Sequence, residues 1–146
     1  MTPLEFVVPL GALESVAGVL PYAILALLLA TFVTRHQAHD RHKRAAHEGA
    51  EALERYTPHV AISVLLVFVC FLYMVVHPHG GMVLSILVLG MVVSDFFEFE
   101  ARQVEARNDM ALELPKSAII ASFVALLYAL YQSLFWVIKG PWEAVV

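Results

Sequence analysis

Apolar residues follow one another in four long runs along this chain, at about residues 15–34, 59–77, 80–98 and 117–138. The runs are continuous and lack the alternation of apolar and polar positions that a membrane β-barrel strand requires. A helix of about 20 apolar residues crosses roughly 30 Å of hydrocarbon. The pattern therefore predicts an all-α fold, a four-helix transmembrane bundle that forms one domain over residues 1–146.

Cations indicate the orientation of these helices. They cluster between the first and second runs and between the third and fourth, at Arg35, Arg41, Lys43, Arg44 and Arg55, and at Arg102, Arg107 and Lys116. Short positively charged loops stay on the cytoplasmic side. We therefore expect both of these loops inside, in partly helical form, and both termini outside with the turn at residues 77–81. The first Lys or Arg is at position 35, so no secretory signal is expected.

The composition is typical of a membrane protein, and it argues against nucleic acid binding and an internal disulfide. Hydrophobic residues make up 60% of the chain and charged residues 15%, whereas soluble domains have about 45–50% and 25%. The only basic cluster, RHKR at residues 41–44, is short and lies beside a membrane surface, so nucleic acid binding has no support. Cys70 is the only cysteine, which excludes an internal disulfide.

The third run is the shortest, with its uncharged part at residues 80–94, and Asp95 follows directly. A carboxylate at the edge of the hydrocarbon is costly and needs a partner. His59 begins the second helix and Lys116 the fourth, at the same inner surface. We therefore predict a polar cluster of His59, Asp95, Glu98 and Lys116. It could line an ion or proton path, or it could be a structural network of helix-end ion pairs.

Histidines occur at two further places. His77, His79 and Met82 could bind copper, because imidazole and thioether are soft ligands. However, Pro78 and the two glycines that follow are typical of a tight reversal between helices, and we favour a turn over a metal site. Among the loop histidines His36, His39, His42 and His47, the first three are spaced at three residues rather than at the four of helical zinc motifs. We interpret them as solvated, and no cofactor is expected.

The fourth run has a face of small and hydrogen-bonding residues, at Ala118, Ser122, Ala125, Ala129 and Gln132. Such a seam lets helices approach closely in lipid. It could pack inside the bundle, which we favour, or against another subunit.

Three sequence segments are similar to those of a known family, namely RYTPHV, VHPHGGMVLS and DFFEFEARQVEARNDM. They resemble a small, functionally uncharacterised multi-pass membrane protein family of haloarchaea. The resemblance implies four helices in the cell membrane of an archaeal halophile, and it implies no activity and no site residues.

Catalytic motifs such as GxSxG, a Walker loop or a dinucleotide fingerprint are absent from the sequence. We therefore expect a non-enzymatic accessory or structural subunit of a larger membrane complex or of a homo-oligomer. Its partners would be the lipid bilayer and other membrane subunits or further copies of the chain. The alternatives are a small oligomeric ion or proton channel or transporter, and a metal- or haem-binding redox subunit.

Overall fold

The structure, a computed structural model, describes residues 9–145, apart from the side chains of residues 136–139. All regular elements in this part are helical, which confirms the all-α prediction. They are α2 (Leu10–Val16), α3 (Leu20–Ala46), the 3₁₀ turn η1 (Ala50–Ala52), α4 (Thr57–Val76), α5 (Pro78–Arg107) and α6 (Lys116–Val145).

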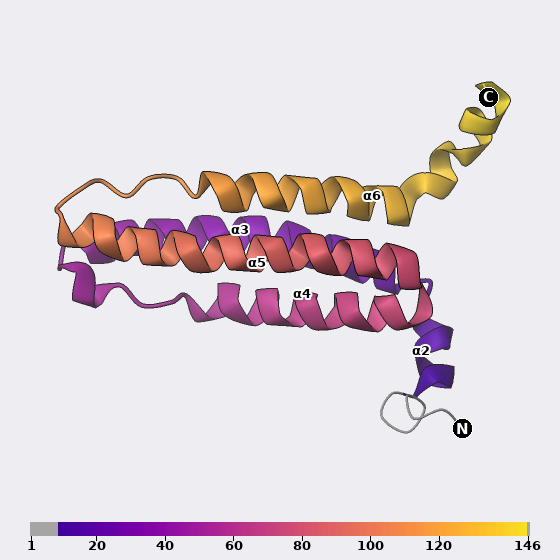
Figure 1. Cartoon of the computed structure of the whole chain (residues 1–146), viewed down its shortest axis with the longest axis horizontal. Helices are drawn as coiled ribbons and strands as arrows, with labels where there is room; N and C mark the ends of the chain where they lie inside the picture. The colour runs from indigo at the N-terminus through magenta and orange to yellow at the C-terminus, as the bar shows by residue number, and fades with distance from the viewer. Residues whose placement is uncertain (1–8, 146) are drawn as a thin grey trace.

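The four long helices α3 to α6 lie side by side as an antiparallel bundle (Figure 1). Each helix contacts the next one along the chain, and α6 also contacts α3, which closes the ring. Helices α3 and α5 therefore face each other diagonally across the interior. The short α2 and the last turns of α6 extend from the end of the bundle where α4 reverses into α5.

Three helices among the described residues are long and apolar enough to cross a membrane, namely α4, α5 and residues 116–135 of α6. A fourth span is obtained if α2 and α3, which meet at a bend of 71°, are taken together. Residues 1–8 and 146 lie outside the described part, so the outside location of the termini stays a prediction.

The first helix differs from its predicted extent of about 15–34. The chain bends after Val16, and Pro21 lies in the first turn of α3 rather than kinking a longer helix. Proline suits that position because the first turn does not need its missing N–H. Helix α3 then continues past Thr34 to Ala46, since no proline or glycine interrupts it. The basic segment predicted as an inner loop is thus largely the polar extension of α3, and only η1 and extended backbone follow before α4.

A single residue, His77, separates α4 from α5. Its Nδ1 accepts a hydrogen bond from the Gly80 backbone N–H at 3.3 Å and so caps the new helix. Gly81 permits a very close approach of the two helices, because a Cβ atom there would lie 2.1 Å from the Met74 Cα atom. The stretch HPHGG therefore forms the reversal between the two antiparallel helices.

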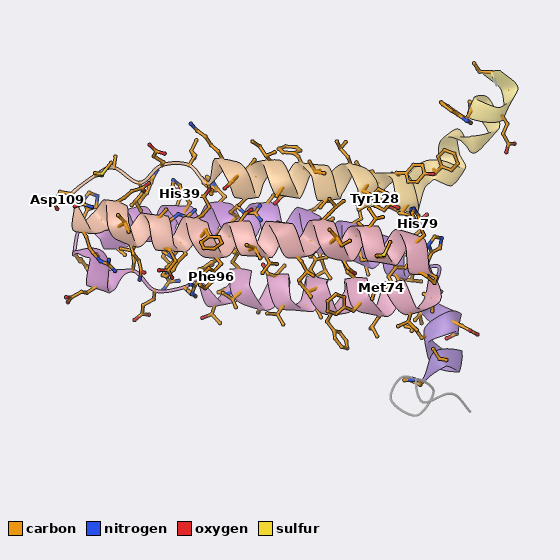
Figure 2. The ribbon with its side chains drawn as sticks, viewed as in Figure 1. His39, Met74, His79, Phe96, Asp109 and Tyr128 are labelled. Atoms are coloured by element: carbon orange, nitrogen blue, oxygen red, sulfur yellow. The ribbon has the colours of Figure 1, made fainter. Side chains whose placement is uncertain are left out.

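The interior is mainly apolar from the α4–α5 reversal through the middle of the bundle and becomes polar toward the opposite end. Near the α4–α5 reversal and through the middle of the bundle it is filled by fully buried Ile24, Leu28, Leu66, Leu84, Val88 and Met91. Toward the opposite end, charged and polar side chains such as Arg35, His39 and Arg102 are buried instead, and Figure 2 shows most of the charged side chains toward that end. This polar part contains the candidate site.

Candidate functional site

Asp95 of α5 is held by an arginine that lies across the bundle. Its Oδ1 atom accepts from Arg35 Nε at 2.7 Å, and its Oδ2 atom accepts from Arg35 Nη2 at 2.9 Å. This two-pronged arrangement is the strongest form of Arg–carboxylate pairing. The Arg35 side chain is only 3% exposed, so the pair is buried in the interior of the bundle.

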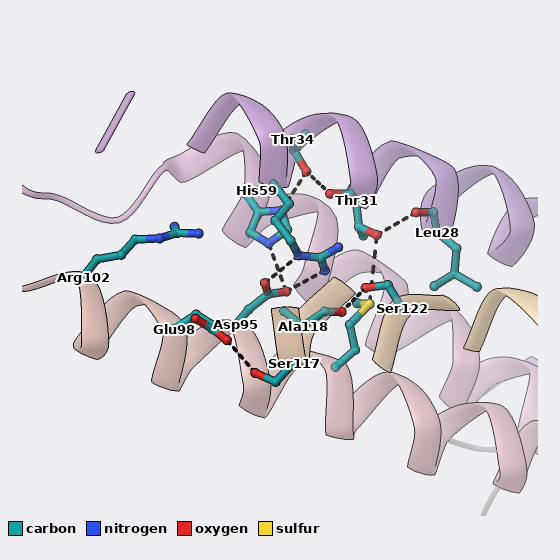
Figure 3. Close-up of polar contacts among 12 residues, drawn as sticks. Leu28, Thr31, Thr34, His59, Asp95, Glu98, Arg102, Ser117, Ala118 and Ser122 are labelled. Carbon is teal, nitrogen blue, oxygen red and sulfur yellow. Dashed lines mark hydrogen bonds and ion pairs between the residues drawn. The ribbon is translucent and has the colours of Figure 1, made fainter. Parts of the chain in front are cut away.

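His59, in the first turn of α4, joins the same carboxylate. Its Nε2 atom lies 3.1 Å from Asp95 Oδ2, within ion-pair distance but without a well-aligned hydrogen bond. Its Nδ1 atom lies 2.7 Å from Thr34 Oγ1 (Figure 3). Thr34 Oγ1 is also 3.3 Å from the Thr31 carbonyl oxygen. Three helices therefore contribute to one connected network around the Asp95 carboxylate.

The structure brings only two members of the predicted four-residue cluster into this network. His59 and Asp95 meet, whereas Glu98, about one turn farther along α5, accepts a hydrogen bond from Ser117 Oγ at 2.5 Å. Lys116 begins α6 with an exposed side chain. The partner that sequence reasoning missed is Arg35.

A sequence signal for Arg35 was present. Buried residues recur along α3 at spacings of three and four, and Arg35 falls in this series of Ile24, Leu28, Thr31, Arg35, Ala38 and His42. A repeat of three and four marks the inward face of a helix. Because the apolar run ends at Thr34, the sequence reasoning places Arg35 in the cationic inner loop instead.

A second diagonal contact joins Arg102 of α5 to His42 of α3. Arg102 Nη1 lies 3.0 Å from His42 Nδ1, and His42 Nε2 lies 2.7 Å from the Glu54 carbonyl oxygen. An arginine only donates and a carbonyl only accepts. His42 is therefore neutral, with its proton on Nε2, where it donates to Glu54.

The loop histidines are not all solvated, contrary to the sequence interpretation. His39 and His42 are buried on the inward face of the α3 extension, whereas His36 and His47 are exposed. Burial lowers the pKa of His42, and the nearby charge of Arg102 acts in the same direction, while the hydrogen bond to Glu54 opposes them. The interior of this polar extension thus favours neutral histidine.

A cavity of about 260 Å³ lies between α3, α4 and α5 beside these two contacts. Its lining includes Arg35, His59 and Asp95 of the first contact and His42 and Arg102 of the second. Its remaining walls are formed mainly by apolar and aromatic side chains, namely Ala38, Tyr56, Val60, Val64, Val92, Phe96 and Phe99, with Ser63 and Arg55 among them. The arrangement is a small apolar chamber with cationic hydrogen-bond donors.

The residues considered for a metal lie at the other end of the bundle. His77 uses Nδ1 to cap α5 and stacks against Tyr73, with ring centroids 5.3 Å apart. His79 and Met82 are exposed. Within the described residues, no three histidine, cysteine or acidic side chains are grouped closely enough to hold a metal ion.

The small-residue seam of α6 faces the interior of the bundle. Ala118, Ser122, Ala125 and Ala129 are fully buried or nearly so. At its end, Gln132 Oε1 accepts a hydrogen bond from the Tyr73 hydroxyl at 2.8 Å, and Gln132 Nε2 donates to Tyr128. The seam thus lets α6 pack closely within this chain.

Comparison with known proteins places the chain in a family. Residues 2–146 match the family described as a domain of unknown function (DUF7313), and the chain belongs to that family. No curated protein and no solved structure matches it.

Proposed function

We propose that this protein is a multi-pass protein of the cell membrane with four spans. The observation that carries the proposal is the outer surface of the bundle, where large apolar side chains are exposed on every long helix. They include Leu29 and Val33 on α3, Val64 and Phe68 on α4, Ile86 and Val93 on α5, and Ile120 and Leu127 on α6. A water-soluble protein rarely exposes so extended an apolar surface, whereas lipid chains would cover it at no cost.

The distribution of charge supports an orientation with the polar end inside. Arg35, Arg55, Arg102 and the basic end of α3 lie toward the end of the bundle opposite the α4–α5 reversal, as their positions along the helices show. Cations on short loops favour the cytoplasmic side. In this orientation α2 and the end of α6 lie outside.

Within the membrane we assign the protein a non-enzymatic role as an accessory subunit that acts by binding. The middle of the bundle is filled by apolar side chains with no exposed surface, such as Ile24, Leu28 and Leu66. An interior so largely apolar disfavours conduction through one chain. The chamber at the inner end, with its cationic hydrogen-bond donors, is suited to binding. Partners would be other membrane subunits or further copies of the chain, which would contact the outer apolar surface because the α6 seam is used internally.

Gentle detergent extraction followed by mass spectrometry tests this role. We expect other membrane proteins, or several copies of the chain, to co-purify with it. A chain that remains monodisperse and monomeric without companions would contradict the accessory role. Membrane-impermeant labelling of tags on Met1 and Val146 tests the orientation separately, and both tags should react in intact cells.

A small oligomeric proton or ion conduit is the second candidate, because Asp95, His59 and Thr34 form a buried chain of exchangeable groups. Reconstituted liposomes distinguish the two. The accessory role predicts no flux above that of empty vesicles. Flux that disappears in Asp95→Asn would replace the accessory role with the conduit.

A further inference from the structure

The chamber contains one arginine, Arg102, that no carboxylate contacts in the described part of the chain. Three arginines and a single carboxylate line it. Arg35 is neutralised by Asp95, and Arg55 Nη2 lies 3.1 Å from Glu100 Oε1 at the surface. Arg102 is 5% exposed, and no ion pair is formed by it within the described residues. Its one side-chain hydrogen-bond partner in this part of the chain, His42, is neutral. The carboxylates Glu98, Asp95 and Glu105 favour its charge only from beyond ion-pair distance.

Several hydrogen-bond donors of the chamber are also unused. Arg102 Nε, Arg35 Nη1 and Ser63 Oγ are buried without a partner, and all three residues line the chamber. A buried donor that lacks an acceptor is costly, and a charged one more so. Figure 3 shows the Arg102 side chain extending toward the network of His59 and Asp95. These donors match an anion with several acceptor oxygens.

The shape of the chamber indicates what kind of molecule carries that anion. Its walls are mostly apolar, and three of its lining residues, Val60, Val64 and Phe96, are also exposed on the outer surface of α4 and α5. The chamber therefore opens sideways, toward the surface that lipid chains cover in the proposed membrane location. Its volume of about 260 Å³ is below the roughly 300–1,000 Å³ of pockets for drug-sized ligands. It has room for a headgroup phosphate but not for acyl chains.

We propose that this chamber binds the phosphate of an anionic phospholipid from the inner leaflet. Arg102 and the free Nη1 of Arg35 donate to the phosphate oxygens, and the acyl chains leave between α4 and α5 past Val64 and Phe96. Basic pockets between membrane helices on the cytoplasmic side are suited to such headgroups, and guanidinium groups match phosphate geometry. The inference rests on the membrane location proposed above and adds a ligand class to it.

Native mass spectrometry of the whole purified chain, released from detergent micelles with added lipid, tests the proposal. Wild type should retain phosphatidylglycerol in preference to phosphatidylcholine. Arg102→Gln should weaken phosphatidylglycerol binding by at least about tenfold, because charge-assisted hydrogen bonds are lost. Arg107→Gln is the matched control, since Arg107 is an exposed cation at the end of the same helix, and it should bind like wild type. Equal weakening by both variants, or by neither, would overturn the proposal.

A second variant is designed to block the opening of the chamber between α4 and α5 without removing a charge. Val64 is 63% exposed, so Val64→Trp should fold normally and should lose phosphatidylglycerol by steric exclusion of the acyl chains. Unchanged lipid binding in a folded Val64→Trp protein would refute the route between α4 and α5. This variant keeps the proposal testable even if Arg102→Gln fails to fold.

Inorganic phosphate separates a lipid from a soluble anion. Thermal unfolding of wild type in zwitterionic detergent should shift upward with phosphatidylglycerol and not with millimolar phosphate. An equal shift with phosphate alone would assign the chamber to a soluble anion and overturn the lipid assignment. A chain that fails to partition into membranes would defeat the membrane proposal itself. Normal insertion without a lipid preference would defeat only the inference about this chamber.

Discussion

Replacing Gly81 by alanine tests the closest helix contact in the structure. Gly81 lies in the first turn of α5, against Met74 in the last turn of α4. A Cβ atom at this position would lie 2.1 Å from the Met74 Cα atom and 2.3 Å from its backbone nitrogen. Both are backbone atoms of a helix, so no side-chain rotation relieves the clash.

The geometry sets the size of the expected effect. Ordinary carbon contacts begin at 3.4 Å, so the two backbones must separate by 3.4 minus 2.1, or about 1.3 Å, on substitution. A gap of about 0.5–1 Å already forfeits a quarter to a half of the dispersion energy of a contact. Overpacking of this kind costs about 1–3 kcal/mol. With only His77 between the helices to absorb the shift, we expect a loss near the upper limit, about 3 kcal/mol.

A titration of sodium dodecyl sulfate into mixed micelles unfolds the purified protein, and far-UV circular dichroism monitors the loss of helix. The midpoints of these titrations measure the loss of stability. Gly90→Ala is the matched control on the same helix. Nothing lies within 4 Å of a Cβ atom at Gly90, and alanine favours helix by up to about 1 kcal/mol over glycine. The control should therefore equal or exceed wild type in stability. If Gly81→Ala unfolds at the same point as Gly90→Ala, the close approach of α4 and α5 is wrong.

Three further predictions use the same unfolding measurement. Asp95→Asn leaves Arg35 buried without a counterion and should lower the free energy of unfolding by about 3–5 kcal/mol. Adding Arg35→Met should recover part of that loss. Strictly additive losses would show that the two residues do not pair. Tyr73→Phe removes the hydroxyl that donates to Gln132 and should cost about 0.6 kcal/mol, at most about 1.7; a larger loss would indicate a role beyond this bond. The pKa of His42 is lowered from its ordinary 6.5, so the folded protein resists protonation there. The stability from this group is therefore fully present above pH 6.5 and falls as the pH drops below it. His42→Gln should reduce this fall between pH 7.5 and 5.5, and an unchanged pH dependence would exclude His42 as its source.

The long helices could be predicted from the sequence because their causes are local. A run of apolar residues without breakers specifies a long helix wherever it lies, and the runs at residues 59–77, 80–98 and 117–138 correspond to parts of α4, α5 and α6. The end of such a run does not mark the end of the helix, however. Helix α3 continues for twelve residues beyond Thr34, because helix formation depends on the absence of breakers and not on hydropathy.

The pairings inside the bundle were decided only by the tertiary structure. The position of Asp95 directly after a short apolar run indicated that it needs a partner. The identity of the cation that reaches it depends on which helices face each other. Because α3 and α5 lie diagonally across the ring, the partner is Arg35, 60 positions earlier in the chain, and Lys116 remains at the surface. The same diagonal brings Arg102 to His42 and leaves it without a carboxylate in ion-pair contact among the described residues. Local sequence determined which segments are helical and apolar. The order of the helices around a common interior determined which charges meet, because contacts between charged side chains are made across the bundle and not along the chain.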